Sequence, residues 1–318
     1  MAIFRKLLLT FDVEDFINPN AIFALQRILE ILEKHKVKVI FFITGHMAEK
    51  LSNYPTIMDM LKNHEIGYHS SSHSVHPTIP EYTDVKSYKK AYEISIKRET
   101  SHINPLTGKT EKEGGIYFLK DLFYSQKIEA FRAPGMCWTP PNTEALKSLG
   151  IKYDFSTSLT LSEPVSYKGV TFYPFTVTQE WNGTVYDYEC LINSILKNRI
   201  TVFDLHPTLL VNRIEWDSIY YKGNPKKLSA VPKRSEKEAS ILFRKFELLI
   251  KHIIVLNKVK LIDINPNFNI PSKSLNLISK EQVQKCYENS MQWPQKRFNY
   301  YPKFIHEHFH EFFNEICH

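Results

Sequence analysis

The chain has 318 residues, 43% of them apolar and 24% charged, and a formal net charge of +7. These proportions are ordinary for a folded globular protein and exclude a disordered or fibrous chain. The excess of Lys and Arg is spread along the chain without interleaved aromatic residues, which argues against nucleic acid as a partner. It leaves a solvated surface or attraction to an anionic substrate as interpretations.

The cysteines and the first residues bear on the compartment. Cys137, Cys190, Cys286 and Cys317 stand far apart without a Cys-x-x-Cys pair, which fits a reducing compartment better than a disulfide framework. The apolar run near the start is too short for a signal peptide, and no stretch reaches membrane-spanning length. We therefore expect a cytoplasmic protein with no transmembrane segment.

Apolar runs alternate with helical patterns along the first hundred residues. Residues 6–11 form a continuous apolar run, which is typical of a strand buried on both faces. Asn18 and Pro19 are expected to be the cap and first residue of a helix over 20–35. The other elements predicted here are strands over 38–44 and 66–69 and helices over 47–63 and 87–99.

The same alternation resumes after a stretch that reads as a loop, 104–115. Alternating strands and helices favour a parallel sheet, and seven or eight strands suggest a deformed (β/α)7–8 TIM-like barrel with its chemistry at the C-terminal strand ends. Ser235 and Glu238 form a predicted capping box. The elements predicted here are strands 129–132, 152–156, 170–177, 200–205 and 259–264, and helices 143–149 and 235–255.

The last fifty residues break the pattern. A cap at Ser279 with Gln282 and a helical apolar face within 304–316 predict a helical extension. We divide the chain into a barrel over 1–268 and an extension over 269–318 that packs on the barrel or on a second copy in a homo-oligomer. A His-Glu-x-x-His pattern, 306–310, stands too near the C-terminus for a protease site and is explained by the helix.

Acidic and imidazole groups gather after two predicted strands. Asp12, Glu14 and Asp15 end the first strand, and His69 and His73 follow the third. Buried carboxylates are costly without a partner, and a divalent metal supplies one. Two histidines and a carboxylate with open positions suit hydrolytic zinc, or iron, manganese or cobalt, which lower the pKa of bound water and polarise a carbonyl.

Four ordered motifs carry a family resemblance: TFDVED at 10–15, HSSSH at 69–73, FRAPG at 131–135 and DLHP at 204–207. In them the chain resembles the NodB-homology polysaccharide deacetylases, family 4 of the carbohydrate esterases. The resemblance implies a metal-dependent hydrolase that removes an N-acetyl or N-formyl group from an amino sugar. The substrate would be a glycan or a precursor linked to lipid or nucleotide.

The resemblance also implies roles around the metal. Asp12 would be the general base, and His69 and His73 would be metal ligands. Val13 stands where the usual motif has its second Asp, so Glu14 is the preferred third ligand. Strand alternation places Glu14 on the same face as Asp12, with Asp15 as the alternative.

Further roles concern the base and the leaving group. Arg132 would pair with and orient Asp12, and the backbone N–H near Gly135 would hold the oxyanion. His206 would be the general acid that protonates the leaving amine. The aspartates of the family's fourth motif are reduced to Asp154, so Asp204 is the substitute expected to orient His206.

Other readings stay open. Trp138 could stack on a sugar or pack in the core, and residues 220–234 could be a lid over an anionic substrate or a solvated loop. His46 and His76 are expected to be structural. The alternative functions are a metal-free allantoinase-like cyclic amidase and an inactive barrel that only binds glycan.

Overall fold

The structure, a computed structural model, describes residues 5–156, 164–174, 177–178, 188–268, 276–277 and 279–308. Within these residues one sheet has the strand order β10-β11-β1-β2-β3-β6-β7-β9-β8-β12. Every neighbouring pair is parallel except β8 with β9. The strands are β1 (Lys6–Val13), β2 (Ile40–Ile43), β3 (Glu65–Tyr68), β6 (Ala130–Phe131), β7 (Tyr153–Asp154), β8 (Val165–Tyr167), β9 (Val170–Phe172), β10 (Val177–Thr178), β11 (Ile200–Leu205) and β12 (Asn276–Leu277).

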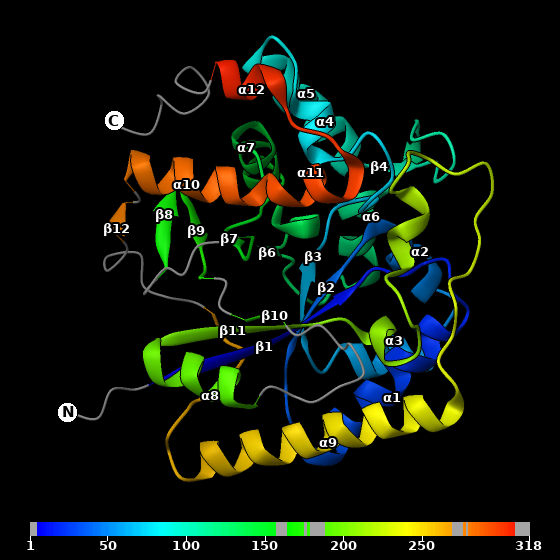
Figure 1. Cartoon of the computed structure of the whole chain (residues 1–318), viewed down its shortest axis with the longest axis vertical. Helices are drawn as coiled ribbons and strands as arrows, with labels where there is room; N and C mark the ends of the chain where they lie inside the picture. The colour runs from blue at the N-terminus through cyan, green and yellow to red at the C-terminus, as the bar shows by residue number, and fades with distance from the viewer. Residues whose placement is uncertain are drawn as a thin grey trace.

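The sheet is curled, and no ladder joins its end strands β10 and β12 in the described part of the chain. The prediction of an α/β fold built on a deformed barrel is confirmed. Helices cover its outside: α1 (Asn20–His35), α2 (Gly45–Leu51), α3 (Pro55–Leu61), α4 (Ile79–Thr83), α5 (Tyr88–Glu99), α6 (Gly115–Leu122), α7 (Pro140–Ser148), α8 (Tyr188–Lys197) and α9 (Glu236–Lys258). In Figure 1, α1 and α9 lie together at one end of the molecule.

Strand alternation explains where the polar groups lie. On β1, Leu7, Leu9 and Phe11 face the helices, whereas Leu8 belongs to a separate interior cluster with residues of β2, β6 and β11. Thr10 follows Leu8 on the inner face, as expected for a period of two. β1 and β11 therefore carry apolar side chains inside the barrel and polar ones near their C-terminal ends.

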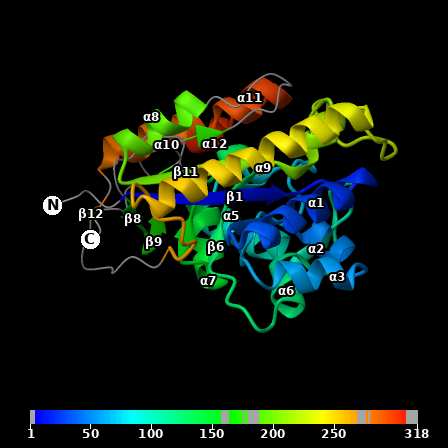
Figure 2. The ribbon, with the colours of Figure 1, turned by 90° about the horizontal axis from the view of Figure 1, so that it is seen from below.

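The C-terminal segment contains α10 (Lys280–Ser290), α11 (Gln292–Phe298) and α12 (Lys303–Glu307), and its capping box at Ser279 and Gln282 is observed. It lies at the end of the molecule opposite α9 (Figure 1), and in the view from below α9 is seen beside α1 (Figure 2). Asp84 binds it to the barrel, because its carboxylate accepts hydrogen bonds from the backbone N–H groups of Lys303, Phe304 and Ile305 at 2.8–3.1 Å. The proposed division at residue 268 stays a prediction.

Three predicted elements differ from those observed. The helix over 47–63 is two helices, because Pro55 lacks an N–H and begins α3. The loop over 104–115 includes β5 (Thr110–Glu113), which pairs with β4 (Ser101–Ile103) in a hairpin. The strand over 259–264 is reduced to one bridge between Asp263 and Lys6.

Local details correct one further prediction and leave another open. Pro19 rather than Asn18 stands at the N-cap of α1, and the Asn18 side chain instead contacts Asp15 and the N–H of Val231. The helical face over 304–316 is described only as far as residue 308, so the rest of it and the side chains of His306 and His310 lie outside the described residues. No helix in the described part of the chain is long and apolar enough to span a bilayer.

Cys137 and Cys286 are buried, while the Cys190 side chain and Cys317 lie outside the described residues. The expected lack of disulfides stays a prediction. The compartment stays a prediction.

Candidate active site

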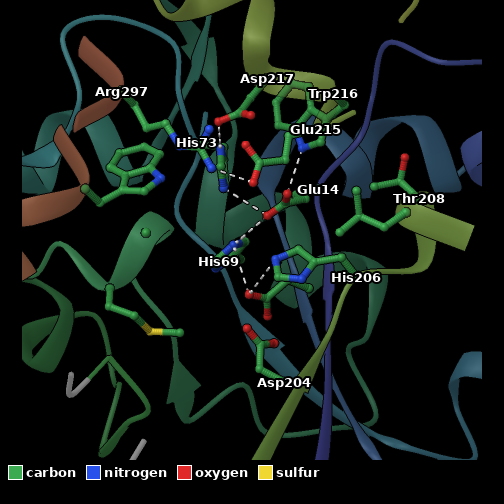
Figure 3. A pocket seen from close by; sticks show the side chains of 15 residues that line it. Glu14, His69, His73, Asp204, His206, Thr208, Glu215, Trp216, Asp217 and Arg297 are labelled. Atoms are coloured by element: carbon green, nitrogen blue, oxygen red, sulfur yellow. Dashed lines mark hydrogen bonds and ion pairs between the residues drawn. The ribbon is translucent and has the colours of Figure 1, made fainter. Parts of the chain in front are cut away.

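A pocket of about 250 Å3 opens at the C-terminal ends of β1, β3 and β11 (Figure 3). Inward-facing polar residues of these strands and of the loops after them converge on it. It is lined by Asp12, Glu14, His69, His73, Gly135, Met136, Asp204, His206, Thr208, Leu209, Glu215, Trp216, Asp217, Trp293 and Arg297. Asp12, Glu14 and the three histidines predicted from the sequence therefore meet in one cavity, whereas Asp15 does not line it.

Glu14, His69 and His73 form a buried three-membered donor group. Glu14 Oε2 lies 3.0 Å from His69 Nε2 and 2.9 Å from His73 Nε2. One oxygen and two nitrogens from three different positions thus face a common centre. This is a facial donor set of the kind that binds zinc or another divalent first-row metal.

The outer nitrogens of both imidazoles are already used. His69 Nδ1 lies 2.8 Å from the carbonyl oxygen of Arg132, so it donates there. His73 Nδ1 lies 2.7 Å from Ser74 Oγ, and Ser74 donates in turn to Asp217 Oδ2 at 2.6 Å. These bonds assign the proton of each neutral ring to Nδ1 and leave both Nε2 lone pairs pointing at a carboxylate oxygen.

Three electron-rich atoms at these distances repel one another unless a proton or a cation lies between them. Burial alone would raise the pKa of Glu14, but His73 and His69 hold it well below its usual range. Burial disfavours the charged form of His73, yet Glu14 outweighs this and raises the pKa of that imidazole. Glu14, His69 and His73 are therefore chemically suited to hold a divalent cation.

Asp15, the alternative third ligand, is committed elsewhere. Its Oδ1 accepts from the N–H of Asn18 at 2.9 Å, and its Oδ2 accepts from Thr208 Oγ1 at 2.6 Å and from Asn212 Nδ2 at 3.2 Å. Burial raises the pKa of Asp15 in spite of these donors. Asp15 ties the end of β1 to the segment after β11, and the geometry favours Glu14 as the ligand.

Arg132 lies fully buried beneath the donor group. Its Nη1 donates to Asp12 Oδ1 at 2.7 Å and to Asp204 Oδ1 at 2.6 Å, and its Nη2 donates to Thr10 Oγ1 at 2.7 Å. The guanidinium also stacks 4.4 Å from the ring centre of Phe42. Asp12 is thus held by one oxygen, and its Oδ2 faces the pocket 3.6 Å from His69 Nε2.

His206 approaches Asp12 from β11, with Nε2 3.8 Å from Asp12 Oδ2. Burial disfavours its charged form, but Asp204, Glu14 and Asp12 outweigh burial and raise the pKa of His206 to about 9. The imidazole is therefore protonated at neutral pH. In metal-free protein His206 can therefore act as a proton donor in the pocket.

The group expected to orient His206 is not found. Asp204 hydrogen-bonds Arg132 rather than His206, and burial raises the pKa of Asp204 to about 6. Asp154 accepts from the N–H of Ser156 instead. Nδ1 of His206 is buried without a hydrogen-bond partner among the described residues.

The two residues expected to bind substrate separate in space. Gly135 lines the pocket, but Trp138 is 2% exposed and packs among Tyr167 and Phe172 in the core. Trp138 therefore does not face the pocket, and the core interpretation holds. The aromatic wall is Trp293 of α11, whose ring would lie 2.1 Å from a Cβ at position 135.

Several pocket residues lie outside the predicted motifs. Glu215, Trp216 and Asp217 come from the start of η3 (Trp216–Tyr220), and Arg297 comes from α11. Arg297 Nη2 lies 2.6 Å from Glu215 Oε1, which joins the two segments at the pocket rim. An acid–aromatic–acid string next to the fourth motif was the only sequence signal for the first three.

The predicted lid is not observed over the pocket. None of residues 220–234 lines it. Asn224 instead binds the backbone of His76, and the side chain of His76 pairs with Glu81 at 2.8 Å. His46 donates to the carbonyl of Ile103, and burial lowers its pKa to about 4. Both histidines therefore have structural partners outside the pocket, in keeping with the prediction.

Comparison with known proteins identifies one family. Residues 4–153 match the family model described as polysaccharide deacetylase. The match includes Asp12, Glu14, the two imidazoles of the donor group and Arg132, and it ends before His206. No curated protein matches the chain.

Solved structures with similar folds include BA3943, a CE4 family pseudoenzyme from Bacillus anthracis, at 18% identity and a TM-score of 0.36, covering 65% of this chain and 56% of that one. A CE4 esterase of Streptococcus mutans is 15% identical with a TM-score of 0.42, covering 79% and 82%. The Bc1960 peptidoglycan N-acetylglucosamine deacetylase is 17% identical with a TM-score of 0.40, covering 80% and 85%. The chain thus spans little more than half the length of the pseudoenzyme.

Proposed function

Residues 4–153 belong to the polysaccharide deacetylase family of hydrolases that act on N-acetyl amide bonds, and on that premise we propose that this chain removes an N-acetyl group from an amino sugar. The substrate is a glycan or a glycan precursor, with formyl as the alternative acyl group and a lipid or nucleotide as the alternative carrier. The observation that carries the proposal is the meeting of the Glu14–His69–His73 donor group with Asp12 and His206 in one pocket.

Glu14, His69 and His73 would hold the cation, zinc first and iron, manganese or cobalt as alternatives. When bound there, a divalent cation supplies a Lewis acid that stabilises negative charge on oxygen. The bonds from His69 to the Arg132 carbonyl and from His73 to Ser74 support this assignment, because ligating histidines usually donate their second N–H in this way.

Asp12 is the proposed general base. Arg132 fixes its Oδ1, so Oδ2 is presented to the pocket and can take a proton from the attacking water. The water oxygen bonds to the amide carbon as this proton leaves. The buried ion pair keeps Asp12 oriented while the substrate enters.

His206 is the proposed general acid. Its Nε2 lies within 3.8 Å of Asp12, so the base and the acid flank the same position. As the C–N bond breaks, the imidazolium gives its proton to the nitrogen, and the products are a free amine and a carboxylate. The backbone N–H near Gly135 is the proposed second donor to the oxyanion.

The sugar ring would rest against Trp293, whose indole packs on Gly135. The missing side chain at position 135 leaves room for the indole of a residue far along the chain, and that indole is partly exposed in the pocket. Aromatic faces are suited to the apolar face of a sugar. Trp293 thus takes the substrate-binding role that the sequence suggested for Trp138.

The test is release of acetate or formate from a panel of N-acylated oligosaccharides, nucleotide sugars and lipid-linked sugars, together with the metal content of the purified protein. His73→Ala should lose both the ion and the activity, whereas His102→Ala, outside the pocket, should keep both. Full activity in an ion-free His73→Ala variant would rule the proposal out. Glycan binding without an ion or product release would favour an inactive binding barrel.

A further inference from the structure

Residues at the start of η3 are hydrogen-bonded, directly or through one hydroxyl, to two members of the donor group. Trp216 reaches Glu14, and Asp217 reaches His73 through Ser74. We propose that Trp216 and Asp217 are positioning residues that orient Glu14 and His73 for the cation, an inference that rests on the proposed metal site. Both lie beyond residue 153, where the family match ends.

Trp216 controls how Glu14 can bind. Its Nε1–H donates to Glu14 Oε1 at 2.7 Å, and its side chain is 1% exposed. The indole packs against Phe16 and the His73 ring, with centroids 5.3 Å apart in each case. With Oε1 occupied, only Oε2 is left to face the two Nε2 atoms, so Glu14 binds through a single oxygen.

Asp217 acts on His73 at one remove. Ser74 accepts from His73 Nδ1 at 2.7 Å and donates to Asp217 Oδ2 at 2.6 Å, and both Ser74 and Asp217 are buried. The carboxylate fixes the direction of the hydroxyl proton, so the hydroxyl oxygen is free to accept. The two hydrogen bonds that link His73, Ser74 and Asp217 therefore set both the tautomer and the rotation of the His73 ring.

The two proposed histidine ligands are therefore held in place in different ways. His69 is held by a main-chain carbonyl, which no side-chain substitution removes. His73 sits at a φ of +48°, a backbone conformation that is unfavourable for a residue with a side chain. Its orientation depends on Ser74 and Asp217, so the support from η3 matters most for the second histidine.

The experiment measures ion binding rather than turnover. Metal-free protein is titrated with Zn²⁺ against a chelator of known affinity and with Co²⁺ by its visible absorption. Ser74→Ala, Asp217→Ala and Trp216→Phe should each weaken binding about 10- to 100-fold, as for other groups that orient metal ligands. Asp217→Asn should recover part of the loss, because its amide oxygen can still accept from Ser74.

Non-additivity provides the sharper test. Because Ser74 and Asp217 act in series, the Ser74→Ala/Asp217→Ala double variant should bind the ion no more weakly than the worse single variant. Matched controls are Ser95→Ala and Trp138→Phe, which alter buried residues away from the donor group. They should lower the melting temperature without changing ion affinity.

Two outcomes overturn the inference separately from the proposed function. If the parent binds the ion and the η3 variants bind it within twofold, the positioning role is wrong while the metal site stands. Fully additive losses in the double variant would also reject the series arrangement. A parent protein that binds no ion overturns both proposals.

Discussion

The two halves of the pocket are built in different ways. Up to Gly135, short motifs at strand ends supply the donor group, the proposed base and the arginine that holds it. After residue 200, the loop after β11 supplies the proposed acid, and η3 and α11 supply further lining residues. In the first half the polar residues fall within short contiguous sequence motifs. The second half is formed by segments that are separated in the sequence and meet only in the folded chain.

The largest effect is expected in the first half. Asp12→Asn removes the base but keeps the shape of the side chain, so the rate should fall about 10²- to 10⁴-fold while Zn²⁺ affinity stays near that of the parent. Steady-state kinetics and the chelator titration measure the two quantities. An unchanged rate would remove Asp12 from its role and leave the donor group in place.

The next prediction removes Arg132, which pairs with Asp12 of the first half and with Asp204 of the second. Arg132→Met leaves Asp12 and Asp204 buried without the guanidinium that pairs with both of them, and the free energy of unfolding should fall by about 3–5 kcal/mol. Denaturant unfolding of the metal-free protein measures it. Arg27→Met, which removes an exposed pair with Glu30, should change stability by less than about 1 kcal/mol. Similar values for the two variants would contradict the structural role of the buried pair.

A smaller effect is expected at Trp293 of α11, which forms the aromatic wall of the pocket. Trp293→Ala should raise KM by a few-fold to about tenfold with a lesser effect on kcat, because it removes contact with the sugar but leaves the reacting groups in place. Gly135→Ala should act in the same direction, since its new Cβ would overlap the indole. A fall in kcat alone, with KM unchanged, would assign Trp293 to the reaction rather than to binding.

The smallest effects concern how the stability of the metal-free protein depends on pH. They compare His206, in the second half of the pocket, with His46, which lies outside the pocket. The pKa of His206 is raised to about 9, so its contribution to stability is present below pH 6.5 and lost as the pH rises towards 9. The pKa of His46 is lowered to about 4, so the unfolded chain takes up a proton first and stability falls as the pH drops from 6.5 to 4.

His206→Gln should therefore flatten the alkaline side of the stability profile, and His46→Gln the acid side. Denaturant midpoints from pH 4 to pH 9 test both variants against the parent. If either substitution changed the opposite side instead, the assignment of charge to that histidine would be wrong.

Local signals predicted much of the scaffold. The helix over 20–35, the strand over 200–205 and the capping box at Ser235 agree with the structure, because periodicity and caps act over a few residues. The hairpin over 101–113 was missed because its second strand is polar and exposed and shows no alternation. The strand over 259–264 failed because apolar content cannot show that only Asp263 reaches a neighbour.

The predictions for the site also succeeded where a local pattern was enough and failed where tertiary packing decided. Strand alternation was enough to favour Glu14 over Asp15. Nothing local distinguishes Trp138 from Trp293, since both are tryptophans in mixed surroundings and only the packing of α11 on Gly135 selects one. Asp204 was matched to His206 because the two share a strand face, but the buried arginine competes for that carboxylate.

Arg132 alone supports both the proposed base and one proposed metal ligand of the first half. Its guanidinium holds Asp12 and its carbonyl oxygen holds His69. A substitution that displaces Arg132 should therefore disturb the proposed base and one proposed ligand at the same time, so the two groups cannot be altered independently at this position.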